Sequence, residues 1–313
     1  MTEPVIRNAQ LDDTRYISDL FRTPVTTWQR LDADGRVQDV TYEALSLYER
    51  WLHGGPWMSV ETAAIWLNHL LKRGNVVYVA AQAGEIVGYL EAYPGNEPAP
   101  FGSHVHIAHL VAPNQVIKDT LMRKLRERAT DDDFDRFTTA FSAYDDDART
   151  YYERFGMQRI DRTQQYTIAA QTGQGFYKVT EHPNPNPEQI NGWRMTIGRQ
   201  QSARQHWDAL WPRLWEVIPE IRERRTHRLS FNAAGQTAFL FCQQQLYAPR
   251  TVDVCCWSPK ALKTQLITAL RDWAHRENYR SLRLALSEES TRVLPDDAEN
   301  APQQQDIYAV DVI

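Results

Sequence analysis

The sequence predicts an α/β (α+β) protein made of two tandem domains, each with a mixed, mostly antiparallel central sheet flanked by helices. The first observation is a gapless internal repeat, in which residues 111–142 align with residues 256–287 at a constant offset of 145. The second is that each copy reads as strand, short loop, amphipathic helix and strand. The third is that the elements around the repeat follow one order in both halves. A repeat of this length is typical of a duplicated domain and too long for a solenoid unit.

The first half begins with alternating short strands and amphipathic helices. Asp12 and Asp13 can cap a helix that continues through Phe21. Ser59 can cap another, and Ala83-Gly84 is a turn signal between two strands of a hairpin. Helical spacing predicts helices over 40–53, 59–72, 117–130 and 147–155, and strand patterns cover 5–9, 76–82, 85–93, 104–111, 136–142 and 162–169.

A linker divides the chain within residues 181–192, where three prolines alternate with asparagines and favour an extended backbone. We therefore predict an N-terminal domain over 1–174 and a C-terminal domain over 175–313. In the second half, Ser258 and Pro259 predict a helix start. The expected strands are 192–199, 228–232, 237–247, 251–257, 281–286 and 307–312. A helical region interrupted by Pro212 and Pro219 is expected over 203–225, and a helix over 259–277.

Composition narrows the function classes. The net charge of −5 and the absence of a long basic run argue against nucleic acid as a partner. No stretch approaches the length of apolar chain that spans a membrane, and the start has no apolar signal core, so we expect a cytoplasmic protein without a membrane partner. The three cysteines form neither a disulfide framework nor a metal-ligand pattern. His104, His106 and His109 do not share one face of their strand, so no metal site is expected.

Tryptophans are numerous for this length, ten in all, and imply large buried aromatic surfaces or apolar grooves. Trp207, Trp211 and Trp215 recur every four residues, which is typical of a stripe in a core or at a domain interface. A homodimer formed through a tryptophan-rich surface is compatible with each function considered below.

Several segments of the first half resemble the GNAT superfamily of acyl-CoA N-acyltransferases. VAAQAGEIVGYLEA (79–92) is similar to that family's central hairpin, and HIAHLVAP (106–113) is similar to its fourth strand running into the acyl-CoA loop. DDDARTYYERFGMQRI (145–160) is similar to its last helix, and IRNAQLDDTRYISDLF to its opening strand and helix. The second half has the same order of elements with weaker motifs. Two such domains in one chain resemble tandem GNAT proteins such as mycothiol synthase in architecture.

The resemblance implies a V-shaped slot between the fourth and fifth strands, where the fourth strand bonds the pantetheine arm of acetyl-CoA or another acyl-CoA as it would a neighbouring strand. It also implies that the pyrophosphate sits on amides at the start of the next helix, where the helix dipole favours an anion. The acceptor would be the amine of a small molecule. The cofactor-binding residues implied are Leu110, Val111, Asn114, Gln115, Val116, Ile117, Lys118 and Thr120, with His109 on the same strand edge.

Tyr152 matches the family's tyrosine that protonates the leaving thiolate as a general acid. The attacking amine must lose a proton, and Glu91, His106 and His109 are candidates for that base. Each has a structural alternative: Tyr152 can pack its ring on the sheet as Tyr151 can, and each histidine can be a hydrogen-bonded core residue. Glu91 lies on a central hairpin strand, where a lone buried carboxylate would be costly, and this favours a polar cleft.

The sequence departs from the family at the phosphate loop. The family pattern carries glycines there, which allow close approach of backbone amides to the pyrophosphate. Residues 114–120 contain no glycine, and neither does the second copy at 258–264, which brings Lys260 and Lys263 but no tyrosine at the acid position. Two hypotheses remain: an acyl-CoA-dependent N-acyltransferase that works through its first domain, and a non-catalytic tandem GNAT-like protein that binds a small ligand or a partner.

Overall fold

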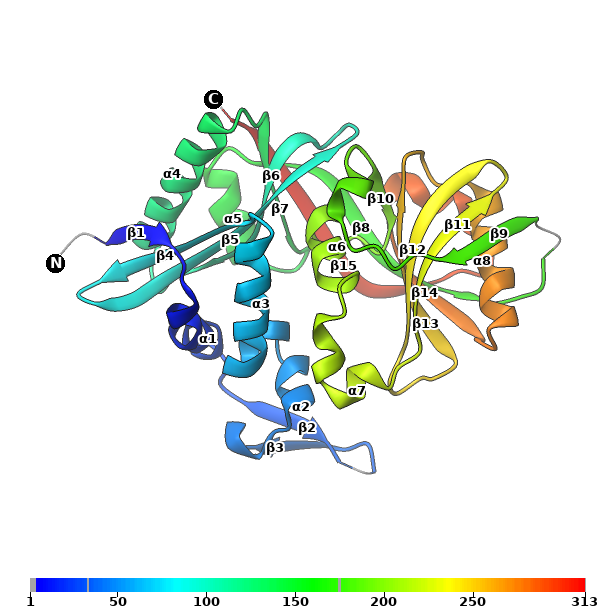
Figure 1. Ribbon diagram of the computed structural model, residues 1–313, viewed down its shortest axis with the longest axis horizontal. Helices are drawn as coiled ribbons and strands as arrows, with labels where there is room; N and C mark the ends of the chain where they lie inside the picture. The colour runs from blue at the N-terminus through cyan, green and yellow to red at the C-terminus, as the bar shows by residue number, and fades with distance from the viewer. Residues whose placement is uncertain (1–3, 33, 174–175, 313) are drawn as a thin grey trace. The chain divides into compact units, whose positions relative to one another are not determined.

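The computed structural model describes residues 4–32, 34–173 and 176–312 (Figure 1). The chain divides into two compact units, each assembled from separate stretches. Unit 1 comprises residues 1–92, 107–133 and 214–222, and unit 2 comprises residues 93–106, 134–213 and 223–313. The boundary predicted between residues 174 and 175 falls on residues outside those described, and it stays a prediction.

Unit 1 contains a sheet in which β1, β4 and β5 lie in that order, and a separate pair formed by β2 and β3. Ala83 and Gly84 both have positive φ (52° and 88°), as the predicted tight turn between β4 and β5 requires. Its elements are β1 (Val5–Asn8), α1 (Thr14–Arg22), β2 (Trp28–Leu31), β3 (Val37–Val40), α2 (Leu47–Leu52), α3 (Val60–Lys72), β4 (Val76–Gln82), the start of β5 (Glu85–Glu97), the end of β6 (Gly102–Val111), α4 (Gln115–Asp131) and α7 (Pro219–Arg222).

Unit 2 contains a sheet with the strand order β7-β15-β8-β14-β13-β12-β11-β9, and β10 pairs with β13. Helix α8 covers a core built from Leu266, Leu270 and Trp273 against the strands of the second half. Its elements are β7 (Arg136–Ser142), α5 (Asp146–Arg154), β8 (Gln158–Ala169), β9 (Tyr177–Glu181), β10 (Arg194–Ile197), α6 (Ala203–Leu210), β11 (Thr226–Ala233), β12 (Gln236–Gln244), β13 (Thr251–Ser258), α8 (Thr264–Arg276), β14 (Ser281–Ser287) and β15 (Glu299–Asp311).

The prediction of a mixed, mostly antiparallel sheet flanked by helices is confirmed. The two copies have the same order of elements. In the first copy the order is β1, β4, β5, β6, α4, β7, α5 and β8, and in the second it is β9, β11, β12, β13, α8, β14 and β15, without a counterpart of α5. The last strands of the two copies are exchanged. Strand β15 lies between β7 and β8, and β8 in turn pairs with β14 (Figure 1).

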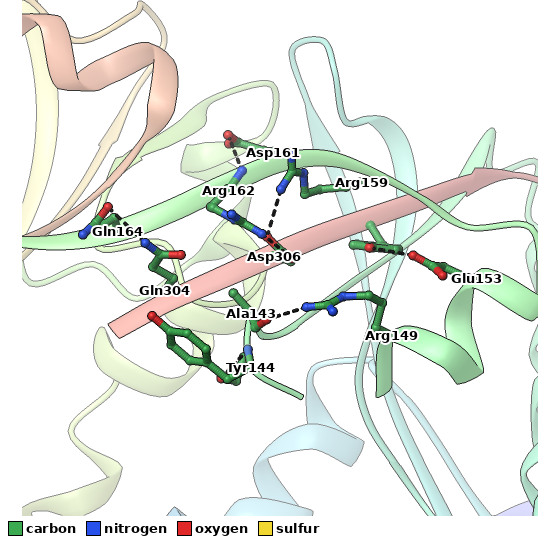
Figure 2. Close-up of polar contacts among 12 residues, drawn as sticks. Ala143, Tyr144, Arg149, Glu153, Arg159, Asp161, Arg162, Gln164, Gln304 and Asp306 are labelled. Atoms are coloured by element: carbon green, nitrogen blue, oxygen red, sulfur yellow. Dashed lines mark hydrogen bonds and ion pairs between the residues drawn. The ribbon is translucent and has the colours of Figure 1, made fainter. Parts of the chain in front are cut away.

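A buried ion pair holds the exchanged strands together. Asp306 of β15 is only 1% exposed and accepts hydrogen bonds from Nε and Nη2 of Arg162 on β8, at 2.5 and 2.9 Å. Arg159 Nη1 lies 3.8 Å from the same carboxylate. Figure 2 shows the three side chains pointing toward one another between the two strands. Because a carboxylate buried without a cation is costly, this cluster specifies which strand lies beside β8.

Three local expectations from the sequence are wrong. The predicted helix over 40–53 is a short 3₁₀ turn followed by α2, whereas the interruption predicted within 203–225 is confirmed, since α6 ends at Leu210 ahead of Pro212 and α7 begins at Pro219. Helix α8 starts at Thr264, because Ser258 is buried and donates its hydroxyl to the Thr237 carbonyl. The Asp13 carboxylate binds Arg7 and the Gln10 amide, and makes no cap bond to α1.

The tryptophan stripe is also divided. Trp207 and Trp211 stack at 3.9 Å in a core of unit 2 with Trp257. Trp215 lies in unit 1, 4.5 Å from Trp51 and 5.6 Å from Trp66 between ring centroids. All three residues of the stripe are buried, but the helix ends before Trp215, so they do not form one face.

Candidate functional site

The end of β6 and the start of α4 form the segment that the family resemblance assigns to acyl-CoA. His104 to Ile107 are buried, whereas residues 108–111 are half-buried, so this end of the strand offers a partly accessible edge. Only residues 112–114 connect β6 to α4. Asn114 caps the helix, since its Oδ1 accepts a hydrogen bond from the Ile117 amide at 3.1 Å. The amides of Gln115 and Val116 are the ones that helix geometry leaves for another acceptor.

The missing glycines have a structural explanation at this helix start. No residue from 111 to 120, all of which are described, has a positive φ, so the backbone takes a course that needs no glycine. Ile117 is buried and packs over Gly88 of β5, where an added Cβ would lie 2.8 Å from Ile117 Cγ2. Val116 is 71% exposed. Of the two branched residues, one therefore anchors the helix and the other projects into solvent.

Glu91 lies at the centre of a buried cluster of aromatic donors. It is 0% exposed and accepts hydrogen bonds from Trp57 Nε1 (3.0 Å), Trp66 Nε1 (3.3 Å) and the Tyr89 hydroxyl (2.9 Å). Burial is the main cause that raises the pKa of Tyr89 well above its usual value, and the negative charge of Glu91 is the second. Tyr89 therefore keeps the proton that it donates. These hydrogen bonds, from at least three donors, offset the free-energy cost of burying the Glu91 carboxylate.

His109 lies near this cluster in unit 1. Its ring meets Phe21 edge to face at 5.1 Å, and Phe21 stacks on Trp57 at 5.5 Å between ring centroids. Two of the predicted catalytic residues, Glu91 and His109, are thus connected through Phe21 and Trp57. His109 is half-buried, so unlike Glu91 it retains contact with solvent.

Tyr152 lies on α5, in unit 2. The residue is 9% exposed, and its ring stacks on Phe141 with centroids 5.6 Å apart. Burial raises the pKa of Tyr152 to about 12, against the smaller opposing effect of a hydrogen bond with the Thr139 side chain. The hydroxyl therefore remains protonated at neutral pH, which a general acid requires.

His106, the third candidate base, is fixed in unit 2 by two hydrogen bonds. Its Nδ1 is 3.0 Å from Thr138 Oγ1, and its Nε2 is 2.8 Å from Gln201 Oε1. The amide oxygen can only accept, so Nε2 carries the proton and Nδ1 accepts from the threonine. The side chain is 2% exposed, and burial lowers the pKa of His106 to about 3, so it is neutral and a poor base at pH 7.

We expect His106 to make the fold sensitive to mild acid. Below its ordinary pKa of 6.5 the unfolded chain takes up a proton at His106 that the folded chain rejects until about pH 3. Stability contributed at neutral pH is therefore lost as pH falls through this window, by about 1.4 kcal/mol per pH unit and about 2 kcal/mol by pH 5. Urea unfolding of the wild type and of His106→Asn at pH 7 and pH 5 measures it. An equal loss in both proteins would contradict the assignment.

Sequence reasoning missed Trp57 and Trp66, the two indole donors to Glu91. Trp57 lies in the segment 53–57, which breaks the helical pattern before α3 and forms a 3₁₀ turn over Gly55–Met58. The sequence signal for Trp57 was its position next to a Gly-Gly-Pro turn. Such a turn predicts a fixed backbone, but it does not predict that the indole bonds Glu91.

Two solved structures of N-acetyltransferases have a fold similar to that of this chain. A GCN5-related N-acetyltransferase from Anabaena variabilis ATCC 29413 is similar over 99% of this chain and 73% of its own, with TM-score 0.62 and 11% identity. A GCN5-related N-acetyltransferase from Kribbella flavida is similar over 99% of this chain and 72% of its own, with TM-score 0.55 and 12% identity. At such identities the likeness concerns the fold alone.

The family follows from the sequence match. Residues 39–157 match the model of the acetyltransferase (GNAT) family, so this part of the chain is a GNAT domain. A search among curated proteins finds no match. All the predicted site residues lie within 39–157, and the family supports acyl transfer as the general class of activity.

Among the residues that the structure describes, no group of three or more His, Cys, Asp or Glu side chains is arranged to hold a metal ion. Over the same residues, none of the helices has the length and apolar character needed to cross a lipid bilayer.

Proposed function

We propose that the first copy transfers an acetyl or other acyl group from acyl-CoA to the amine of a small molecule. The observation that carries this proposal is the family match over residues 39–157, which contains Glu91, His109, the start of α4 and Tyr152. The likeness of the whole chain to acetyltransferase folds is consistent with it.

In this proposal, acyl-CoA is held by the segment from His109 to Thr120. The half-buried edge at Leu110 and Val111 would bond the pantetheine arm as a strand bonds its neighbour. The seventeen-residue helix α4 would present its positive dipole end, with the amides of Gln115 and Val116, to the pyrophosphate. Lys118 and Thr120 lie in the first turns of the same helix and are half-buried.

The amine would attack the thioester carbonyl, so that a C–N bond forms and the C–S bond breaks. Tyr152 is the proposed general acid that protonates the departing thiolate. His109, which is half-buried, is the proposed base for the ammonium proton. Glu91 is enclosed by its donors, so its influence on the amine would pass through the groups that surround it rather than through direct contact.

We expect Tyr152→Phe to lower kcat by about 10²-fold, because the thiolate then leaves without a proton donor. The affinity for CoA should stay unchanged, since the phenyl ring preserves the stack on Phe141. Release of free CoA thiol from acetyl-CoA with a panel of small amines measures the rate, and the thermal shift with CoA measures binding.

Tyr151→Phe is the matched control for this experiment. Tyr151 is the neighbouring residue of α5, and its ring contacts Phe155 at 5.0 Å and the Arg154 guanidinium at 5.4 Å. Full activity in Tyr152→Phe, or equal losses in the two variants, would contradict the proposed acid. No thermal shift of the wild type with millimolar CoA would contradict acyl-CoA binding altogether.

The alternative is a non-catalytic GNAT-like protein that binds a small ligand or a partner. The burial of Tyr152 and the enclosure of Glu91 favour it, because both side chains then serve packing. The same assay separates the two functions: CoA binding without thiol release for any amine would favour the non-catalytic protein.

A further inference from the structure

The second copy has its own fork between a fourth and a fifth strand, β13 and β14, and both lie in unit 2. The two strands pair in parallel from Thr251 with Ser281 to Val254 with Leu284, and the pairing stops there. Both strands nevertheless continue, β13 to Ser258 and β14 to Ser287. This fork is the place where the GNAT fold opens its slot for acyl-CoA.

Strand β10 occupies that slot. It pairs antiparallel with β13 beyond the fork, with Arg194 opposite Ser258, Met195 opposite Trp257 and Ile197 opposite Cys256. Just after the strand, the Gly198 amide donates a hydrogen bond of 2.7 Å to the carbonyl of Ala285 on β14. The segment 194–198 therefore bonds both arms of the fork, as the pantetheine arm would have to do.

The segment fits the fork closely. Gly198 has φ +86°, and an added Cβ would lie 2.6 Å from Cys255 Sγ and 2.8 Å from the Val254 carbonyl. Only glycine combines this conformation with this approach. Ile197 is 0% exposed and belongs to the hydrophobic core of the second copy, with Cys256 and Leu284. Strand β10 is thus part of the core rather than a segment resting on its surface.

The loop after β13 is poorly suited to bind an anion. The Gln236 side-chain amide donates to the Ala261 carbonyl at 2.9 Å and to Ser258 Oγ at 3.1 Å. A pyrophosphate would need backbone N–H groups at this position, whereas here a carbonyl is turned toward a protein donor. Helix α8 begins only at Thr264, and its N-cap Lys263 makes no side-chain cap bond.

We propose that β10 permanently takes the place of acyl-CoA in the second copy, so that one chain binds a single acyl-CoA, through its first copy. The proposal rests on the proposed function of the first copy. Between β1 and β4 of that copy, β2 and β3 pair only with each other across the described residues, so no strand from this stretch joins the large sheet.

Two matched charge variants test which copy binds. Val116 and Ala261 occupy equivalent positions at the repeat offset of 145, and both are exposed. Isothermal titration of the full chain with acetyl-CoA should give one site. We expect Val116→Glu, which adds a negative charge where the pyrophosphate would sit, to raise Kd about tenfold or more. Ala261→Glu should leave Kd within about twofold, and melting curves confirm that both variants fold.

Two sites per chain, or binding weakened by Ala261→Glu and not by Val116→Glu, would overturn the inference and leave the proposed function standing. No binding by the wild type would instead overturn the proposed function, and a second measurement then decides the inference. Hydrogen exchange of residues 193–199 should be as slow as that of β13, with or without acetyl-CoA. Fast exchange that acetyl-CoA slows would show that β10 leaves the slot, and would overturn its permanent place there.

Discussion

Neither copy of the duplication is expected to fold when it is produced alone as residues 1–174 or 175–313. In the first fragment β8 loses both neighbours, β14 and β15, and β7 loses β15. In the second fragment β15 loses β7 and β8. Unit 1 also loses Trp215, which packs on Trp51 and Trp66. Long unpaired strands aggregate, so each fragment should be insoluble or lack a cooperative melting transition in circular dichroism.

Two controls separate strand exchange from general instability. Co-expression of the two fragments should restore a soluble 1:1 complex, because every strand then regains its neighbour. A protease site placed between residues 174 and 175 of the intact chain should leave the two pieces associated after cleavage. A monomeric 1–174 fragment with a cooperative melting transition would show that the first copy is an independent domain, and would refute this expectation.

Strands and helices were largely predictable because their signals are local. Periodicity placed β4 and β7 at their observed limits, and Ser59 as the cap of α3. Strand partners depend on residues far apart in the chain, which a period-two pattern does not encode. The strand pattern over 192–199 therefore predicted β10 but not its place in the fork of β13 and β14. Gly198 was the one local hint, since an isolated glycine at a strand end is typical of a close backbone approach.

The candidate site was predictable only as far as the family motif extends. The motif predicts Tyr152 and the start of α4 as site candidates from their positions in the sequence. It does not predict that Asn114 caps the helix, or that the helix start has no positive φ, because both depend on a connection of only three residues. Glu91 was expected in a polar cleft, since a lone buried carboxylate is costly. Its donors Trp57 and Trp66 lie 34 and 25 residues away in the sequence, too far for a local pattern to reveal.

Glu91→Leu should lower the free energy of unfolding by at least about 3 kcal/mol. The substitution leaves two indole N–H groups and the Tyr89 hydroxyl buried without this acceptor, and each such group costs about 1–3 kcal/mol. Against the 5–15 kcal/mol typical of a native protein, that is a large fraction. Glu91→Gln keeps one acceptor oxygen and the side-chain shape, so the loss should be about 1–2 kcal/mol. Urea unfolding followed by tryptophan fluorescence measures both.

A compensating variant shows whether unpaired donors cause that loss. Trp57→Phe removes one indole N–H, so it should cost less in the Glu91→Leu background than in the wild type, and the double-mutant cycle gives the coupling. Additive losses would mean that the hydrogen bonds to Glu91 contribute little. The folded Glu91→Gln protein then separates a structural role of Glu91 from a chemical one. A fall in kcat at unchanged CoA affinity would assign Glu91 a part in proton transfer. Full activity would mean that Glu91 serves only the structure, as its enclosure by Trp57, Trp66 and Tyr89 indicates.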